Sequence, residues 1–313
     1  MNQLNIKQVV LWGHKLHSSK HSYIHYGFYK AFKSLGYDTL WLDDNDTNNI
    51  YFLSLDFENT LFITEGNVDM KIPIVEGSHY ILFECDLSKY RFKDINILIL
   101  KTYSKDCLFR PYLKKIDRYI FYEYISFYNE FSTIYMPWAT DLLPDEIEEN
   151  MKNIDVVLDN NTDEINFIGS LTQEIFCARF WFIINGYKFN EYGSPKKVSF
   201  KENEELIKKS YIALSLQSET QINKQYITSR IFKNISYGKM GITNNQIVAE
   251  VFDGNIIYNS DIQKVLELGI EFEKSDKEIK KARILFLMDY VKQKHTYINR
   301  IKSLFKCLTL ISS

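Results

Sequence analysis

The amino-acid sequence predicts an α/β protein built from two doubly wound domains. Short apolar runs alternate along the chain with helical patterns, which is the order that successive βαβ units produce. Residues 95–100, INILIL, are continuously apolar, as expected of a parallel strand that is buried on both faces. The alternation begins again after a connector bounded by two prolines, so a second, similar domain is expected.

The first half of the chain opens with a strand, a helix and a second strand. An apolar run at 9–12 is followed by a helical stripe that includes Ile24, Phe28 and Ala31, and Gly36 is a natural stop for this helix. A strand at 39–42 completes the unit, which implies parallel pairing through a right-handed crossover. Further strands are expected at 61–64, 80–83, 95–100, 119–122 and 133–136.

The connector MPWATDLLPDEIEENM spans residues 136–151 and ends in an acidic helix start after its second proline. Beyond it, strands are expected at 165–171, 187–195, 212–217, 240–245 and 255–259, with helices at 174–186, 204–211, 228–238 and 248–252. A long final helix, or two joined helices, is expected from Ser275, which forms a capping box with Glu278. The predicted domains are 1–140 and 141–290, followed by a C-terminal helix at 291–313.

Composition excludes several classes of protein. The 313 residues carry 38 basic and 40 acidic side chains, a formal charge of −2, so no nucleic-acid partner is expected. The cysteines have no spacing typical of zinc sites or disulfide frameworks, which suggests reduced thiols; they are Cys85, Cys107, Cys177 and Cys307. No segment reaches the ~18 apolar residues of a membrane span, so we expect a cytoplasmic protein without a transmembrane segment.

Four of the six histidines lie between residues 14 and 25: His14, His17, His21 and His25. On one continuous helix they would form a stripe able to bind zinc. The segment instead follows a strand and a glycine, which predicts a loop, and the run contains no carboxylate or cysteine to complete a closed site. No metal is therefore expected. The run is either a solvated polar loop or a substrate-binding loop at the carboxyl end of a strand.

A phosphate-binding element is expected in the second domain. A helix opens at Thr228 or Ser229 with Arg230 in its first turn. The unpaired amides and the positive dipole end of a helix N-terminus favour phosphate, and an arginine adds a planar fork of donors. The pair Gly169 and Ser170, after the first strand of this domain, would bring further amides to the same place.

These motifs resemble those of group 1 glycosyltransferases with the GT-B fold, most closely the spore-maturation-protein branch. Residues 230–238, RIFKNISYG, followed by MGITNN, resemble the nucleotide-sugar motif of that family. Three further stretches agree in order: FIGSL, NEYGSP and HTYINRIKSLF. The resemblance covers residues 137–308, whereas the first half of the chain matches only in layout.

The resemblance implies two Rossmann-like domains facing a central cleft, with the last helix crossing back to the first domain. It also implies a transferase that moves a sugar from a nucleoside diphosphate to a glycan or another hydroxyl acceptor, as in polysaccharide biosynthesis, without a metal or other cofactor. Residue by residue, the nucleobase would lie near Tyr192 and Gly193, and the diphosphate near Gly169, Ser170, Ser229 and Arg230. In such an enzyme His14 and His21 are the candidate catalytic residues, ahead of His17 and His25.

One residue departs from the family pattern. Family members carry a glutamate after the phenylalanine of the motif, where it holds the ribose hydroxyls, and this chain has Lys233, which cannot accept hydrogen bonds. Gln217 or Glu219 would have to substitute for the glutamate, or donor binding is weakened. The alternatives are a non-catalytic nucleotide-binding or glycan-binding relative and a sugar-nucleotide epimerase of the same fold.

Overall fold

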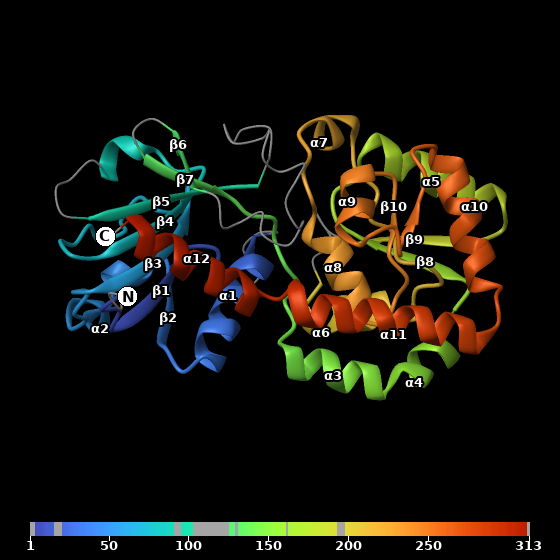
Figure 1. Cartoon of the computed structure of the whole chain (residues 1–313), viewed down its shortest axis with the longest axis horizontal. Helices are drawn as coiled ribbons and strands as arrows, with labels where there is room; N and C mark the ends of the chain where they lie inside the picture. Colours follow the sequence, from blue (N-terminus) through green and yellow to red (C-terminus); the bar gives the residue numbers. More distant parts are fainter. Residues whose placement is uncertain are drawn as a thin grey trace. The chain divides into compact units, whose positions relative to one another are not determined.

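The computed structural model describes residues 4–15, 21–90, 95–102, 125–128, 131–160, 162–192 and 198–311. The chain divides into two compact units (Figure 1). Unit 1 comprises Met1–Pro137 together with Tyr297–Ser313, and unit 2 comprises Trp138–Thr296. Among the helices of the described ranges, none is both long enough and apolar enough to cross a lipid bilayer.

Unit 1 is built on a seven-stranded sheet with the strand order β2-β1-β3-β4-β5-β7-β6. Its strands are β1 (Gln8–Trp12), β2 (Asp38–Leu42), β3 (Thr60–Glu65), β4 (His79–Phe83), β5 (Asn96–Lys101), β6 (Ile125–Tyr128) and β7 (Phe131–Tyr135). Neighbouring strands are parallel except β6, which pairs antiparallel with β7 and was not predicted. The strand predicted at 119–122 lies outside the described residues. The parallel α/β sheet itself is confirmed.

The predicted burial of the strands on both faces is also observed. Residues 9–12 of β1 are completely buried. One face of the sheet carries an aromatic core in which Phe62 stacks on Tyr80 at 4.9 Å between ring centroids, and Tyr90 lies 5.7 Å from Tyr80. Three short helices belong to the connections of this unit: η1 (Asp46–Asn48), α2 (Ile50–Leu53) and η2 (Leu87–Tyr90).

Two longer helices of unit 1 pack side by side, α1 (Ser22–Ser34) and α12 (Tyr297–Ile311) (Figure 1). Phe28 of α1 lies 4.5 Å from Tyr297 of α12, measured between ring centroids. Gly27 permits this approach, because a Cβ at that position would overlap the Tyr297 ring. The last helix of the chain therefore returns to the first unit, as the sequence predicts.

Unit 2 contains two pairs of parallel strands, β8 (Glu164–Ile168) with β9 (Lys188–Tyr192) and β10 (Ile242–Thr243) with β11 (Ile257–Tyr258). The predicted strand at 212–217 is extended, but it forms only one bridge, between Leu214 and Ile242. The amide of Asn234 donates to the carbonyl oxygens of Ala213 and Leu214. A helix side chain thus satisfies backbone groups that a longer strand ladder would otherwise have used.

The helices of unit 2 are α3 (Pro144–Lys152), α4 (Ile154–Asp159), α5 (Gln173–Ile184), α6 (Phe200–Lys209), α7 (Glu219–Asn223), α8 (Ser229–Ser236), α9 (Gln246–Val251), α10 (Ile262–Glu273) and α11 (Lys277–Lys294). Pro144 opens α3, as predicted for the connector. The predicted capping box is wrong: Asp276 caps α11, and the hydroxyl of Ser275 donates to the carbonyl of Phe272 at the end of α10. Helices α4, α7 and α10 were not predicted.

Candidate functional site

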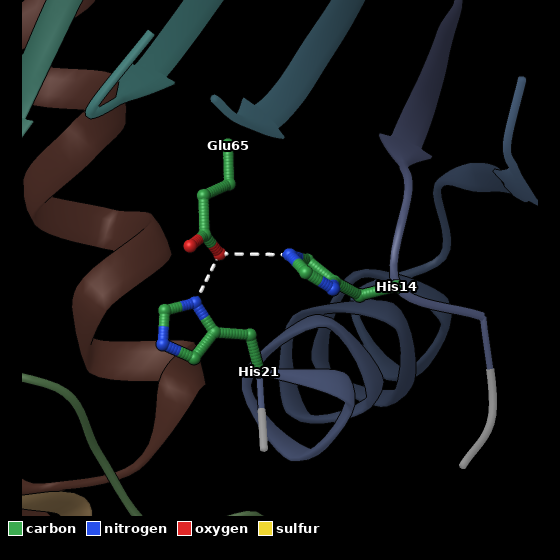
Figure 2. Close-up of side chains that lie close together, drawn as sticks. All are labelled: His14, His21 and Glu65. Atoms are coloured by element: carbon green, nitrogen blue, oxygen red, sulfur yellow. Dashed lines mark hydrogen bonds and ion pairs between the residues drawn. The ribbon is translucent and has the colours of Figure 1, made fainter. Parts of the chain in front are cut away.

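Two histidines and a glutamate converge at one edge of the unit 1 sheet (Figure 2). Because β1 and β3 are parallel neighbours, with Trp12 opposite Thr64, His14 and Glu65 emerge together at the carboxyl ends of these strands. His21 directly precedes α1. Nε2 of His14 lies 3.0 Å from Oε2 of Glu65, and Nδ1 of His21 contacts the same oxygen.

The backbone after β1 turns sharply to place His14. Gly13 and His14 have φ angles of 89° and 51°, so two consecutive residues adopt left-handed conformations. Such a conformation is uncommon for a residue other than glycine and is often found at functional sites. The carbonyl of Gly13 accepts hydrogen bonds from the indole of Trp41 and from Nδ1 of His25, which fixes the turn.

The electrostatics of the cluster determine which ring nitrogens carry protons. Burial alone would raise the pKa of Glu65, but the hydrogen bonds from His14 and His21 outweigh burial and lower it to about 2. The carboxylate is therefore ionised and can only accept hydrogen bonds. In the neutral rings, Nε2 of His14 and Nδ1 of His21 are then the protonated atoms, and the lone pairs lie on the opposite nitrogens.

The structure places the three described histidines of the run in different environments. His14 and His21 share one carboxylate, whereas His25 lies one turn into α1, as predicted, and is buried. Burial, followed by the charge of His14, lowers the pKa of His25 to about 4, so this ring is neutral at physiological pH. Its hydrogen bond to the carbonyl of Gly13 stabilises the turn after β1, which is a structural role. His17 lies outside the described residues.

A second site lies in unit 2, where β8 ends next to the start of α8. The guanidinium of Arg230 lies over the ring of Phe167, 4.6 Å from the ring centroid. Gly169 follows β8 with a φ of 147°, and a Cβ at this position would overlap the guanidinium. The amide of Gly169 donates to the carbonyl of Tyr192 at the end of β9. The structure thus brings together Gly169, Tyr192 and Arg230, which the sequence assigns to one site.

Arg230 is a cation without an acidic partner within the described part of the chain. Burial lowers its pKa to about 10, so the guanidinium still carries its charge at neutral pH. A partly desolvated guanidinium without a counter-ion among the described residues gains strongly from an incoming anion, because the unfavourable free energy of its burial is already present in the folded protein. Among these residues Arg230 forms no surface ion pair.

The N-terminus of α8 adds further donors at the same place. Its N-cap Thr228 makes no side-chain capping hydrogen bond, and its hydroxyl instead lies 3.2 Å from that of Ser215. Thr228, Ser229 and Arg230 are partly exposed, whereas residues 231–236 are buried. Solvent therefore reaches the positive end of the helix dipole but not the rest of the helix.

Other residues assigned to this site occupy different environments. Ser170 and Glu219 are exposed, and Gly193 lies outside the described residues. Gln217 is completely buried; its amide donates to the carbonyl of Tyr226 and accepts from Asn245. Gln217 therefore holds the loop before α8 in place, so its side chain is already committed within the protein.

Lys233 points into the interior of unit 2. Its ammonium lies 3.6 Å from a carboxylate oxygen of Asp141, and both oxygens of that carboxylate accept from the hydroxyl of Tyr237 at 3.0 Å. Burial lowers the pKa of Lys233, and the charge of Asp141 opposes this effect. The lysine that replaces the expected glutamate is thus part of a buried polar cluster.

Two residues of these sites were missed at the sequence level. Glu65 stands among several acids near predicted strand ends, and only the adjacency of β3 and β1 singles it out. Phe167 lies inside the apolar run of β8, where nothing marks it as the platform for a guanidinium. Strand order would identify the first, but no sequence signal identifies the second.

Comparison with known proteins gives a fold relationship. No family model and no curated protein sequence matches this chain. Among solved structures, an alpha-glucosyltransferase in complex with UDP is 10% identical with a TM-score of 0.58, covering 96% of this chain and 99% of its own. An alpha-glucosyltransferase in complex with UDP and a 13-mer DNA with a central A:G mismatch is 11% identical, with a TM-score of 0.60 and the same coverage. A third, in complex with UDP and a 13-mer DNA containing a HMU base, is 9% identical with a TM-score of 0.57.

The chain has the GT-B fold. Nearly the whole length of the chain and of each solved structure takes part in the match, so both units belong to this fold. The match does not single out the spore-maturation-protein branch, which stays a prediction.

Proposed function

We propose that the protein is a glycosyltransferase that uses a uridine diphosphate sugar. The observation that carries the proposal is the Arg230 guanidinium beside Gly169 at the open N-terminus of α8, which has no acidic partner among the described residues. A diphosphate suits this arrangement, because it accepts hydrogen bonds from backbone amides and from the two edges of a guanidinium. The similarity to alpha-glucosyltransferases in complex with UDP supports a nucleotide of this class.

In the proposed reaction, the bond between the sugar anomeric carbon and the β-phosphate oxygen breaks, and a bond to the acceptor oxygen forms. Arg230 and the amides of α8 would stabilise the negative charge that develops on the departing diphosphate, which is the role that a metal ion takes in other enzymes. No metal is required at this position for that purpose. Tyr192, joined to Gly169 through the backbone, would lie near the nucleobase.

The acceptor hydroxyl must lose a proton in the same reaction. We assign this step to the cluster of His14, His21 and Glu65 in unit 1. Glu65 fixes the tautomers of both rings and would stabilise the imidazolium that forms when a ring takes the proton. His14→Ala and His21→Ala should each lower kcat by about 10²-fold or more, the usual contribution of a general base. His79→Gln, at the opposite end of the sheet, is the matched control.

The acceptor is proposed to be a glycan or another hydroxyl compound. Two of the similar structures contain DNA, so DNA is a second acceptor class to test. The chain's net charge of −2 favours the glycan.

The deciding experiment is an assay of nucleotide release with UDP-, GDP- and dTDP-sugars, with and without acceptors. Release of UDP that depends on Arg230 and is accelerated by an acceptor would support the proposal. The buried Lys233 favours a second candidate, a nucleotide-binding protein without turnover, because it removes the expected ribose-binding carboxylate. Tight UDP binding with no release from any sugar donor would favour that candidate instead.

A further inference from the structure

The cluster in unit 1 has the geometry of a metal site. One ligand atom each from His14, His21 and Glu65 lies within 4.8 Å of the other two (Figure 2). Tetrahedral zinc, with bonds of roughly 2.0–2.1 Å to nitrogen and oxygen, places its ligand atoms about 3.3 Å apart. The distance of 3.0 Å between Nε2 of His14 and Oε2 of Glu65 is already near that value. Small rotations of the side chains would therefore close three atoms around one ion.

We propose that Nε2 of His14, Nδ1 of His21 and Oε2 of Glu65 bind a divalent first-row transition metal of the zinc class. Two imidazoles and one carboxylate form a ligand set typical of zinc sites that keep a fourth position open. Magnesium and calcium prefer sets made of oxygen atoms alone, so the two imidazoles select against them. The fourth position would take a water molecule or the oxygen of a hydroxyl group.

The positions of the ligands support binding rather than chance proximity. Glu65 ends an interior strand of the sheet, His14 follows the adjacent strand, and His21 directly precedes α1 of the same unit. The side chains of His14, His21 and Glu65 keep 12%, 17% and 14% of their surface exposed, so a hydrated ion can reach them although they are mostly enclosed. The sequence alone does not predict this site, because the carboxylate of Glu65 lies 44 residues away from His21 along the chain.

Metal binding would change the tautomers of both rings. The ion needs the lone pairs of Nε2 on His14 and Nδ1 on His21, the two atoms that contact Oε2 of Glu65 in the metal-free cluster. Each neutral ring would move its proton to its other nitrogen when the metal binds. The metal-bound and metal-free states are thus alternative forms of one cluster, and binding itself does not depend on the proposed transferase activity.

The test is calorimetric titration of the chelator-treated full-length protein with ZnCl₂ and, separately, with MgCl₂. Co²⁺ serves as a spectroscopic probe, because a tetrahedral site with nitrogen and oxygen ligands gives intense visible bands. The variants are His14→Ala, His21→Ala and Glu65→Gln, with His79→Gln as the control. His79 starts β4 and lies opposite Leu61, at the far end of β3 from Glu65. Circular dichroism establishes that each variant is folded.

We expect one equivalent of zinc with micromolar or tighter affinity, no comparable binding of magnesium, and a tetrahedral cobalt spectrum. Each cluster variant should weaken zinc binding at least about tenfold, while His79→Gln leaves it unchanged. Glu65→Gln preserves side-chain size and decides the matter if an alanine variant fails to fold. Zinc binding that is absent, or that survives in Glu65→Gln at the parental affinity, would overturn the proposal and leave the assignment of the donor site untouched.

Discussion

Replacing Arg230 should have opposite effects on nucleotide binding and on stability. In Arg230→Gln, the charge-assisted hydrogen bonds to the diphosphate are lost, each contributing about 1.5–3 kcal/mol. Loss of one or two such bonds corresponds to a decrease in UDP affinity of roughly 10- to 10⁴-fold. The Gly169 turn and the N-terminus of α8 remain, so weak binding should persist.

The same substitution should stabilise the protein in the absence of nucleotide. Burial lowers the pKa of Arg230 to about 10 from 12.5, which corresponds to at most about 3 kcal/mol of unfavourable desolvation. Because the side chain is partly exposed and its packing on Phe167 is lost, we expect a net gain of about 1 kcal/mol. For a unit of this size, that gain raises Tm by roughly 2–4 °C.

Both effects are measured by thermal denaturation with and without UDP. The matched control is Arg283→Gln, because Arg283 also lies over a phenylalanine ring of unit 2, that of Phe272, but is exposed on α11. The control should bind UDP as the parent does. The proposed role of this guanidinium would be refuted if Arg230→Gln bound UDP with the affinity of the parent protein. It would also be refuted if the variant had a lower Tm than the parent in the absence of ligand.

Three further predictions concern packing and protonation. Gly169→Ala should lower stability by about 1–3 kcal/mol and weaken UDP binding, because its Cβ overlaps the guanidinium; unchanged melting and affinity would contradict this. Burial lowers the pKa of Lys239 to about 8, so the unfolded chain binds more protons and stability should rise between pH 8 and 10.5. Lys239→Met should therefore have a higher free energy of unfolding than the parent protein at pH 7, by on the order of 2 kcal/mol in urea denaturation, and the difference should be smaller at pH 10. An equal difference at both pH values would contradict this prediction. Gly27→Ala should lower Tm by several degrees, since its Cβ meets the Tyr297 ring, and an unaltered Tm would show that α1 and α12 tolerate separation.

The periodic parts of the chain were predictable because local pattern and tertiary burial agree in them. The strand at 95–100 and the helix that starts at Ser22 are examples, and so is Pro144 at the start of α3. Two of the failures have a cause in side-chain hydrogen bonds. At 212–217, Asn234 takes the carbonyl groups that a strand ladder would use, and at α11 Asp276 competes successfully with Ser275 for the cap.

The candidate sites were predictable only in part, for a related reason. The sequence places Arg230 at a helix start next to a glycine-containing turn, since both features are local. It does not reveal that Arg230 has no acidic partner within the described residues, because that depends on the surroundings in space. The partnership of Glu65 with His14 likewise depends on strand order, which places β3 beside β1.

The most direct test of the donor site compares UDP with uridine in titration calorimetry on the same protein. If the N-terminus of α8 and Arg230 hold the diphosphate, UDP should bind at least about 100-fold more tightly than uridine, because the charged groups contribute most of the affinity. Equal affinity for the two ligands, or no binding of UDP at millimolar concentration, would contradict a diphosphate site at this helix.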